Sequence, residues 1–287
     1  MQEFGIAALD AVAARILDAI AQGEPAPPDA TVFLLRHYVT SERDDLREPL
    51  GTALAQALEA ASRDTSPLAR AAWLTLFVEA AAIADDERIL QAARALVDGL
   101  RADWPIDAAT AAGLIAAAAS VDACLRASSV CDPDEIVPPA IDELERFIGG
   151  AYRPGEGLKV AGARAFQASD RDALAMHVVA SSALLTAFEV TGRLPYSMLA
   201  EELMQPVRRV SAAEDLVWDC RTVRVLCRLA ALHDDTGYRA AAVLAPDADY
   251  RQDAARVLRA HASAALEADV GHAALYGIAL RELISLR

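Results

Sequence analysis

Apolar residues recur along the chain at helical spacing, and the segments they form are of two alternating kinds. Segments of the first kind are apolar on nearly every side: 66–84, 107–128, 170–192 and 270–286. Segments of the second kind have one apolar and one charged face: 86–103, 133–149 and 248–267. A helix that is apolar all round must be surrounded by protein, whereas an amphipathic helix has one face in water. The alternation therefore predicts an inner layer of helices wrapped by an outer layer.

Strand signals are nearly absent, because aromatic residues make up only 5% of the chain and alternation with a period of two is rare. About twelve helices are predicted in all, and those not yet mentioned span 5–22, 30–38, 43–63, 195–211 and 213–235. Some boundaries have a chemical cause. Ser66 and Asp132 are capping residues followed by proline, and Gly192 allows a helix to end in a left-handed conformation.

Six helical hairpins that alternate in this way would close into an α/α toroid, a ring of parallel inner helices inside an outer ring. We predict this all-α fold as a single domain over 1–287, with a half-repeat break near 150–168. The competing arrangement is an open α-solenoid, whose two ends need polar capping helices. The last segment, HAALYGIALRELISL, is too apolar to cap an open end and favours closure.

The charge of the chain limits its partners. Among 287 residues, Lys and Arg number 27 against 42 Asp and Glu, which gives a formal charge of −15. This balance argues against nucleic acid and against anionic membrane surfaces. No uninterrupted apolar run reaches the roughly 20 residues of a membrane span. The first residues lack the cationic start of a secretory signal, so we expect a cytoplasmic protein.

Cysteine and glycine patterns give no sign of a metal or cofactor. No Cys-x-x-Cys or His-x-x-x-His pairing suggests zinc, and the glycines of 152–166 form no nucleotide-binding motif. The four cysteines are expected to be buried, inert thiols: Cys124, Cys131, Cys220 and Cys227.

The region from about 170 to 287 contains the motifs AFEVTGRLPYSMLAEEL, VLCRLAALHDDTGYRAAA and GHAALYGIALREL. Its two Thr-Gly turns are forty-five residues apart, a period typical of stacked helical hairpins. In these motifs the chain resembles the six-hairpin toroids, most of all the toroidal half of the thioredoxin-like proteins of the spermatogenesis-associated type. It is more distantly similar to N-acylglucosamine 2-epimerases and cellobiose epimerases. The resemblance implies a closed ring and descent from proteins that act on small carbohydrates.

Parallel inner helices would bring their N-terminal ends together at one mouth of the toroid. His177 and His272 lie near the starts of two such helices, and imidazole titrates near neutral pH. We predict that they transfer a proton beside a sugar carbonyl, with Asp219 as a third catalytic residue. Predicted ligand contacts are Asp170, Asp172, Arg221, Trp218, Trp73 and Tyr276. Each has a structural alternative, because histidines and aromatic residues also pack in cores and first-turn carboxylates cap helices.

Two functional hypotheses follow. The first is an enzyme of the sugar isomerase or epimerase kind; a glycoside hydrolase is less favoured, because nothing fixes two carboxylates at catalytic separation. The second is a non-catalytic toroid that serves as a binding or interaction module. A small polyhydroxylated ligand is the expected partner, and the alanine-rich surface allows a homo-oligomer.

Arg221, Arg224 and Arg228 form one stripe of a predicted helix. They could clamp a phosphate or carboxylate, but a solvated face paired with carboxylates of a neighbouring helix is the preferred interpretation.

Overall fold

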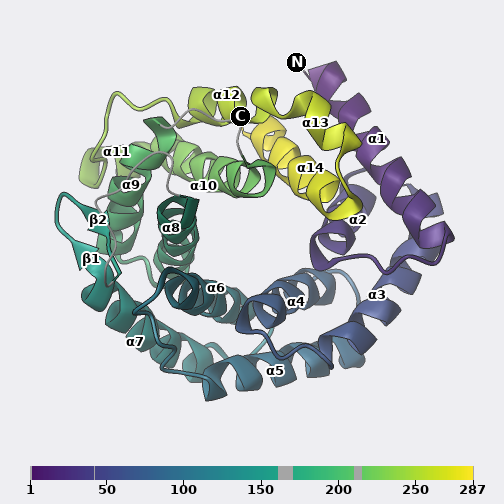
Figure 1. Ribbon diagram of the computed structural model, residues 1–287, viewed down its shortest axis with the longest axis horizontal. Coiled ribbons are helices and arrows are strands. Elements are labelled where there is room, and N and C mark those ends of the chain that lie inside the picture. Colours follow the sequence, from purple (N-terminus) through teal and green to yellow (C-terminus); the bar gives the residue numbers. More distant parts are fainter. Residues whose placement is uncertain (1, 42, 161–170, 210–214, 287) are drawn as a thin grey trace.

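The computed structural model describes residues 2–41, 43–160, 171–209 and 215–286. Six helices form an inner ring (Figure 1): α2 (Pro28–Ser41), α4 (Pro67–Ala81), α6 (Ala111–Ala127), α8 (Arg171–Thr191), α10 (Leu216–Asp234) and α14 (Val270–Ser285). Each inner helix contacts the next one along the chain, and α14 contacts α2. The ring is therefore closed, which confirms the α/α toroid and excludes the open α-solenoid.

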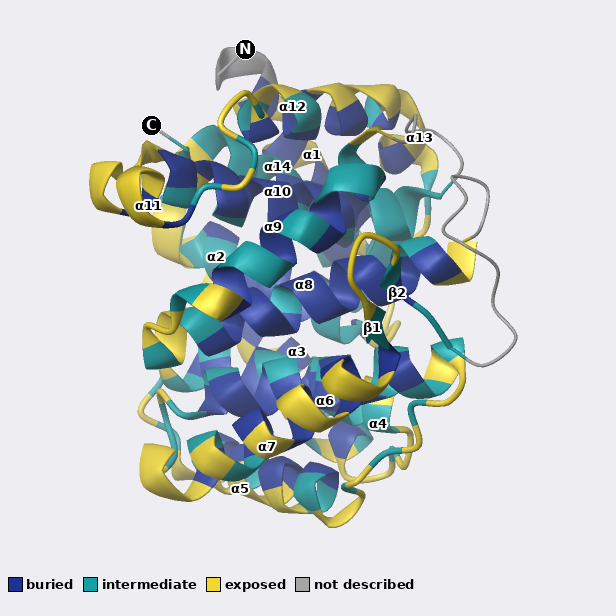
Figure 2. Cartoon of the chain, turned by 90° about the vertical axis from the view of Figure 1, so that its left-hand side faces the viewer, coloured by how far each residue is buried: buried dark blue, intermediate teal, exposed yellow. Residues whose placement is uncertain are grey.

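The outer helices cover the outside of this ring: α1 (Gln2–Ala21), α3 (Arg47–Ala61), α5 (Glu87–Ala102), α7 (Pro133–Ala151), α9 (Leu194–Arg209) and α12 (Tyr250–Ala260). The apolar segments predicted as inner are α4, α6, α8 and α14, and the amphipathic segments lie outside them, as expected. Figure 2 shows the same division, because exposed residues are concentrated on the outer helices. Burial of the all-round apolar helices by the amphipathic ones is thus what builds the ring.

Three short helices depart from the predicted pattern. The segment 248–267 forms two helices, α12 and α13 (Ala262–Glu267), because the chain breaks at His261. The His261 side chain is buried and bonds to Asp219 on α10, so a tertiary contact replaces the helical continuation. The helix α11 (Thr236–Ala241) and the 3-10 helix η1 (Asp44–Leu46) are too short for periodicity to detect.

Helix boundaries follow the expected chemistry. Ser66 precedes Pro67 at the start of α4, and the side chain of Asp132 accepts a hydrogen bond from the backbone of Asp134 in α7. Gly192 has a φ of +69°, so it supplies the left-handed conformation after α8.

The predicted break near 150–168 begins with a small hairpin of β1 (Tyr152–Arg153) and β2 (Gly157–Leu158). Residues 161–170 of this segment lie outside the described part of the chain. Near the hairpin, α8 is long and apolar enough to cross a membrane by composition alone, but 72% of its most apolar window is buried. A core helix of the toroid accounts for that composition.

Cys124, Cys220 and Cys227 are buried, whereas Cys131 is half-buried. Burial raises the pKa of the three buried thiols to about 12, so they remain protonated at neutral pH.

Candidate functional site

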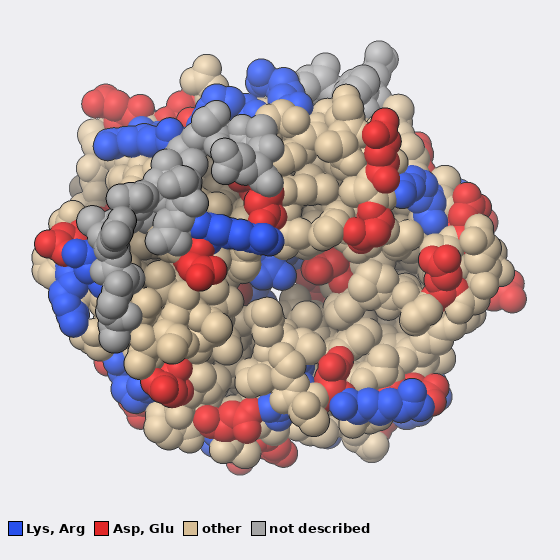
Figure 3. Space-filling model, viewed as in Figure 1, with Lys and Arg blue, Asp and Glu red and all other residues tan. Residues whose placement is uncertain are grey.

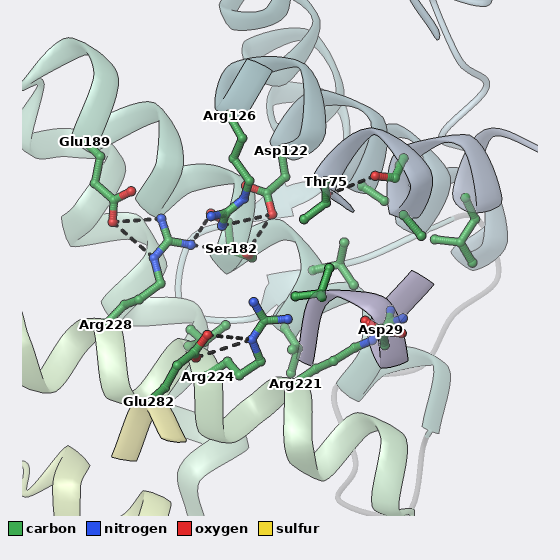
Figure 4. A pocket seen from close by; sticks show the side chains of 18 of the residues that line it. Asp29, Thr75, Asp122, Arg126, Ser182, Glu189, Arg221, Arg224, Arg228 and Glu282 are labelled. Carbon is green, nitrogen blue, oxygen red and sulfur yellow. Dashed lines mark hydrogen bonds and ion pairs between the residues drawn. The ribbon is translucent and has the colours of Figure 1, made fainter. Parts of the chain in front are cut away.

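A cavity of about 350 Å³ occupies the axis of the toroid and is lined by side chains from all six inner helices (Figure 4). In the space-filling view the face of the molecule is hollowed near its centre, where basic and acidic side chains meet (Figure 3). The volume lies in the range of small-molecule sites, roughly 300–1,000 Å³. The ring that the apolar pattern builds therefore encloses a charged site.

The arginine stripe of α10 faces this cavity. Arg221, Arg224 and Arg228 stand at positions i, i+3 and i+7, which share one face of a helix, and all three line the cavity. The preferred sequence interpretation was therefore correct about pairing for Arg224 and Arg228, but wrong about location. These side chains point to the axis of the toroid and not to its outer surface.

One ion-pair network joins α2, α4, α10 and α14 at the cavity. Glu282 receives hydrogen bonds from Arg36 at 2.6 Å and from Arg224 at 3.1 Å, and Arg36 also binds Glu79 at 2.6 and 2.8 Å. Burial alone would raise the pKa of Glu282, but the two guanidinium groups outweigh it and lower that pKa. Glu282 therefore stays ionised.

A second network joins α6, α8 and α10. Asp122 accepts hydrogen bonds from Arg126 at 3.1 Å, Ser182 at 2.8 Å and Thr186 at 2.5 Å. Burial opposes its ionisation, but Arg126, Arg228 and the two hydroxyl groups lower its pKa overall. Like Glu282, Asp122 is therefore ionised at neutral pH.

Arg228 completes this second network. Its guanidinium donates to the Ser182 carbonyl at 3.0 Å and to Thr186 Oγ1 at 2.9 Å, and it pairs with Glu189 at 3.0 Å (Figure 4). Other groups of the protein thus occupy the hydrogen-bond donors of the Arg228 guanidinium.

Arg221 and Asp29 differ from the other charged residues of the cavity. Arg221 lies over the ring of Trp218, with 4.9 Å between the guanidinium carbon and the ring centroid. Among the described residues, no carboxylate lies within ion-pair distance of Arg221, and neither Arg221 nor Asp29 has a side-chain hydrogen bond. Asp29 acts on Arg221 only through the electrostatic field. A donor group and an acceptor group therefore remain available in the same cavity.

The structure places His177 away from the cavity. It is fully buried; Nδ1 donates to the Ala173 carbonyl at 2.7 Å, and Nε2 accepts the Leu158 backbone N–H at 3.2 Å. Neighbouring Val178 lines the cavity, and one residue along a helix corresponds to a turn of about 100°, so His177 faces β2. Burial lowers the pKa of His177, which keeps the ring neutral. The side chain fixes the hairpin to α8.

The other predicted catalytic residues are engaged elsewhere. His272 is 45% exposed in the first turn of α14 and pairs with Asp269 at 2.5 Å. Asp219 binds His261 at 2.6 Å, between α10 and the end of α12. Neither residue lines the cavity. The two histidines are not brought together there, so their positions give no support to the predicted proton transfer beside a sugar carbonyl.

Of the eight predicted site residues within the described part of the chain, Arg221 alone lines the cavity. Trp218 contributes indirectly, as the ring beneath Arg221. Trp73 is buried and donates its indole N–H to Asp64, while Tyr276 is buried in the core. Asp172 is exposed at the start of α8, and Asp170 lies outside the described residues.

The cavity is also lined by charged residues that were not among the predicted site residues: Asp29, Arg36, Asp122, Arg126 and Glu282. A signal existed for Asp122, a single carboxylate inside the apolar stretch TAAGLIAAAASVDACL. A charged residue in a helix that must be buried needs a buried partner. Arg36 and Glu282 carry the same signal in their own inner helices.

Comparison with known proteins shows the fold alone. No family model matches the chain, and no curated protein matches it. Among solved structures, the GH76A α-1,6-mannanase of Salegentibacter sp. HEL1_6 is similar, with a TM-score of 0.58 at 12% identity over 91% of this chain and 89% of that chain. An inactive variant with alanine at two aspartates, in complex with α-1,6-mannotetrose, has a TM-score of 0.60 at 12% identity, covering 89% and 87%.

A second inactive variant, with asparagine at the two aspartates and α-1,6-mannotriose bound, has a TM-score of 0.59 at 12% identity and covers 95% of this chain and 97% of that chain. These neighbours support the α/α-toroid part of the sequence resemblance; they do not extend to the spermatogenesis-associated or epimerase families. The fold of this chain is a helical toroid similar to that of these structures.

Proposed function

We propose that the axial cavity binds a small polyhydroxylated ligand of the carbohydrate class and does not cleave it. The observation that carries the proposal is the pair of unengaged groups, the Arg221 guanidinium and the Asp29 carboxylate. A sugar hydroxyl both accepts and donates a hydrogen bond, so a polyol can satisfy both groups at once. Buried or half-buried polar groups without partners are costly, and a ligand that engages them removes that cost.

The structural neighbours support the carbohydrate class. Two of the similar structures hold α-1,6-linked manno-oligosaccharides, and they share the toroid with this chain. Because the identity is only 12%, the likeness supports the class of ligand and carries no particular sugar to this protein.

The acidic groups of the cavity argue against hydrolysis. Glycoside hydrolysis needs a protonated carboxylic acid with a raised pKa and a second carboxylate at a fixed separation. The pKa values of Asp122 and Glu282 are lowered by arginines, and Glu189 pairs with Arg228. Asp29 remains as a single unengaged carboxylate. Among the described lining residues no two aspartates are adjacent in sequence, unlike the aspartates replaced in the inactive mannanase variants.

Binding and its location are tested together by isothermal titration calorimetry with D-glucose and D-mannose. The variant Ala72→Phe fills the cavity from α4, and the control variant Ala55→Phe places the same ring on an exposed position of α3. We expect Ala72→Phe to weaken binding at least tenfold and Ala55→Phe to leave it unchanged. Binding that survives in Ala72→Phe, or release of new reducing ends from α-1,6-mannotriose, would overturn the proposal.

A further inference from the structure

The five arginines that line the cavity are not equivalent. Arg36 and Arg224 share Glu282, Arg126 binds Asp122, and Arg228 binds Glu189. Within the described residues, only Arg221 among these five has no carboxylate partner. Four of the five guanidinium groups are therefore paired with carboxylates of the protein, whereas the guanidinium of Arg221 has no carboxylate in direct contact.

The ring of Trp218 determines how Arg221 can be used. A guanidinium whose carbon lies 4.9 Å from a ring centroid is attracted to the ring, which restricts where the group can lie. The N–H edge that points away from the ring is then the part of the group that a ligand can reach. No nitrogen of Arg221 is among the fully enclosed polar atoms that lack partners, so its donors are open to the cavity. A preoriented, open fork of this kind matches the two oxygens of a carboxylate or phosphate.

The local charge supports an anion more than the chain as a whole does. Five arginines and four carboxylates line the cavity, and Glu79, which pairs with Arg36, makes the two charges equal there, although the chain as a whole carries −15. Arg221 lies in the second turn of α10, and Asp29 and Leu68 of the same lining lie in the first turns of α2 and α4. The positive ends of several helix dipoles therefore add to the charge of Arg221 at this end of the cavity.

From these observations we infer that the carbohydrate bound by the cavity is acidic, with its carboxylate or phosphate on the edge of Arg221 and its hydroxyls reaching Asp29. The inference rests on the proposed function and names the ligand class. Asp29 does not block it, because no ion pair joins Asp29 to Arg221 and the guanidinium edge stays open. Burial lowers the pKa of the Arg221 guanidinium. A bound anion stabilises the charged form and so acts against this lowering.

The test compares matched ligands by calorimetry: D-glucose, D-glucuronate, which replaces one hydroxymethyl group by a carboxylate, D-glucose 6-phosphate, and inorganic phosphate. We expect the wild-type protein to bind one of the two acidic sugars at least tenfold more tightly than D-glucose. The comparison between glucuronate and glucose 6-phosphate identifies which oxyanion the fork takes. Inorganic phosphate should bind more weakly than the preferred acidic sugar, because it lacks the hydroxyls that reach Asp29.

Three variants assign the effect to Arg221. Arg221→Gln should weaken binding of both kinds of sugar, but it should weaken the acidic sugar at least tenfold more than D-glucose, because D-glucose loses a hydrogen-bond donor and the acidic sugar loses a counter-charge as well. Arg221→Lys should restore part of the preference, because it keeps the charge and loses the fork. Arg63→Gln, in the exposed turn after α3, is the matched control and should change nothing.

The two proposals fail differently. If D-glucose binds as tightly as both acidic sugars, the acidic class is wrong. If the preference persists in Arg221→Gln, the assignment of the acidic group to Arg221 is wrong. In both cases the proposed function stands. If none of the three sugars binds, the proposed function is wrong. If phosphate alone binds, and binds through Arg221, the cavity is an anion site and both carbohydrate proposals are overturned.

Discussion

Two charged centres inside this toroid, one fully buried and one half-buried, are built in opposite ways. Glu201, on the outer helix α9, is fully buried and accepts hydrogen bonds from four groups of the protein: His233, Tyr250 and the backbone N–H groups of Leu244 and Ala245. Arg221, on the inner helix α10, has a ring beneath it and no carboxylate bound to it among the described residues.

The difference separates structural polar groups from available ones. The Glu201 carboxyl group accepts hydrogen bonds from α10, α12 and the chain before α12 in place of hydrogen bonds from water. It therefore holds these elements together. At Arg221 the protein leaves donors without acceptors, which stabilises nothing in the free protein. In the function proposed above, Glu201 with its complete set of partners belongs to the scaffold, whereas Arg221, which lacks a carboxylate partner, is available to a ligand.

The largest effect is expected for Glu201→Ala. This change leaves four donors without an acceptor in the core, so we expect the free energy of unfolding to fall by about 3–5 kcal/mol. Urea unfolding followed by circular dichroism measures it. Glu59→Ala, at an exposed pair with Arg63, is the control and should leave the urea midpoint in place. If Glu201→Ala lowers the free energy of unfolding no more than Glu59→Ala does, Glu201 does not hold the scaffold together.

A smaller loss is expected when the hairpin is pushed away from His177. A Cβ atom at Gly157 would lie 2.3 Å from His177 Nε2, and the residue has a φ of +76°. Gly157→Ala should therefore cost about 2–4 kcal/mol of unfolding free energy. Gly155→Ala has a similar φ of +74° with open space around it, so it should cost only about 1–2 kcal/mol. Equal losses at the two positions would show that His177 is not a rigid partner of the hairpin.

Asp122→Asn should lower the free energy of unfolding at neutral pH by about 1–3 kcal/mol, because Arg126 loses its carboxylate. The pKa of Asp122 in the folded protein is below its ordinary value of 3.8, so its contribution is full above that value and is lost as the pH falls through the lowered pKa. The difference in free energy of unfolding between wild type and variant should therefore become smaller as the pH is lowered. A difference that stays constant down to acidic pH would contradict the assigned pKa direction.

The smallest effect is expected at the binding group itself. Arg221→Gln removes a charge that has no carboxylate partner, so the free energy of unfolding should change by less than about 0.5 kcal/mol or rise slightly. Arg224→Gln, three residues away on the same face, leaves Glu282 with one guanidinium and should cost about 1–2 kcal/mol. Thermal unfolding of the two variants without ligand decides the point. A loss at Arg221 as large as at Arg224 would mean that Arg221 belongs to the scaffold.

The sequence predicted the layers of the fold because apolar periodicity reports burial directly. The inner positions of α4, α6, α8 and α14 follow from segments that have no polar face, and closure follows from the apolar last helix. The break at His261 and the hairpin at 152–158 escaped prediction, because a bond to Asp219 and a contact with His177 come from distant parts of the chain.

The site was harder to predict than the fold, because it depends on helix phase to within one residue. His177 and Val178 are adjacent residues of α8, yet only Val178 lines the cavity. Arg221 was identified from its helix, but its lack of a partner could not be read from a sequence. Polar residues within the other apolar inner helices, such as Asp122, can be recognised in the sequence. That they meet in one cavity depends on closure of the ring and cannot be recognised there.

Closure of the ring also determines when the cavity can exist during synthesis. Arg36 and Glu282 meet across 246 residues of chain, and α1 packs on α14. A growing polypeptide that has not yet released α14 has an incomplete cavity wall, since Glu282 is one of the groups that form it. Such distant contacts make folding slow, because the ends of a long loop must be brought together first. A ligand of this cavity would therefore stabilise the protein only after α14 has joined the ring, and it would not guide the earlier steps of assembly.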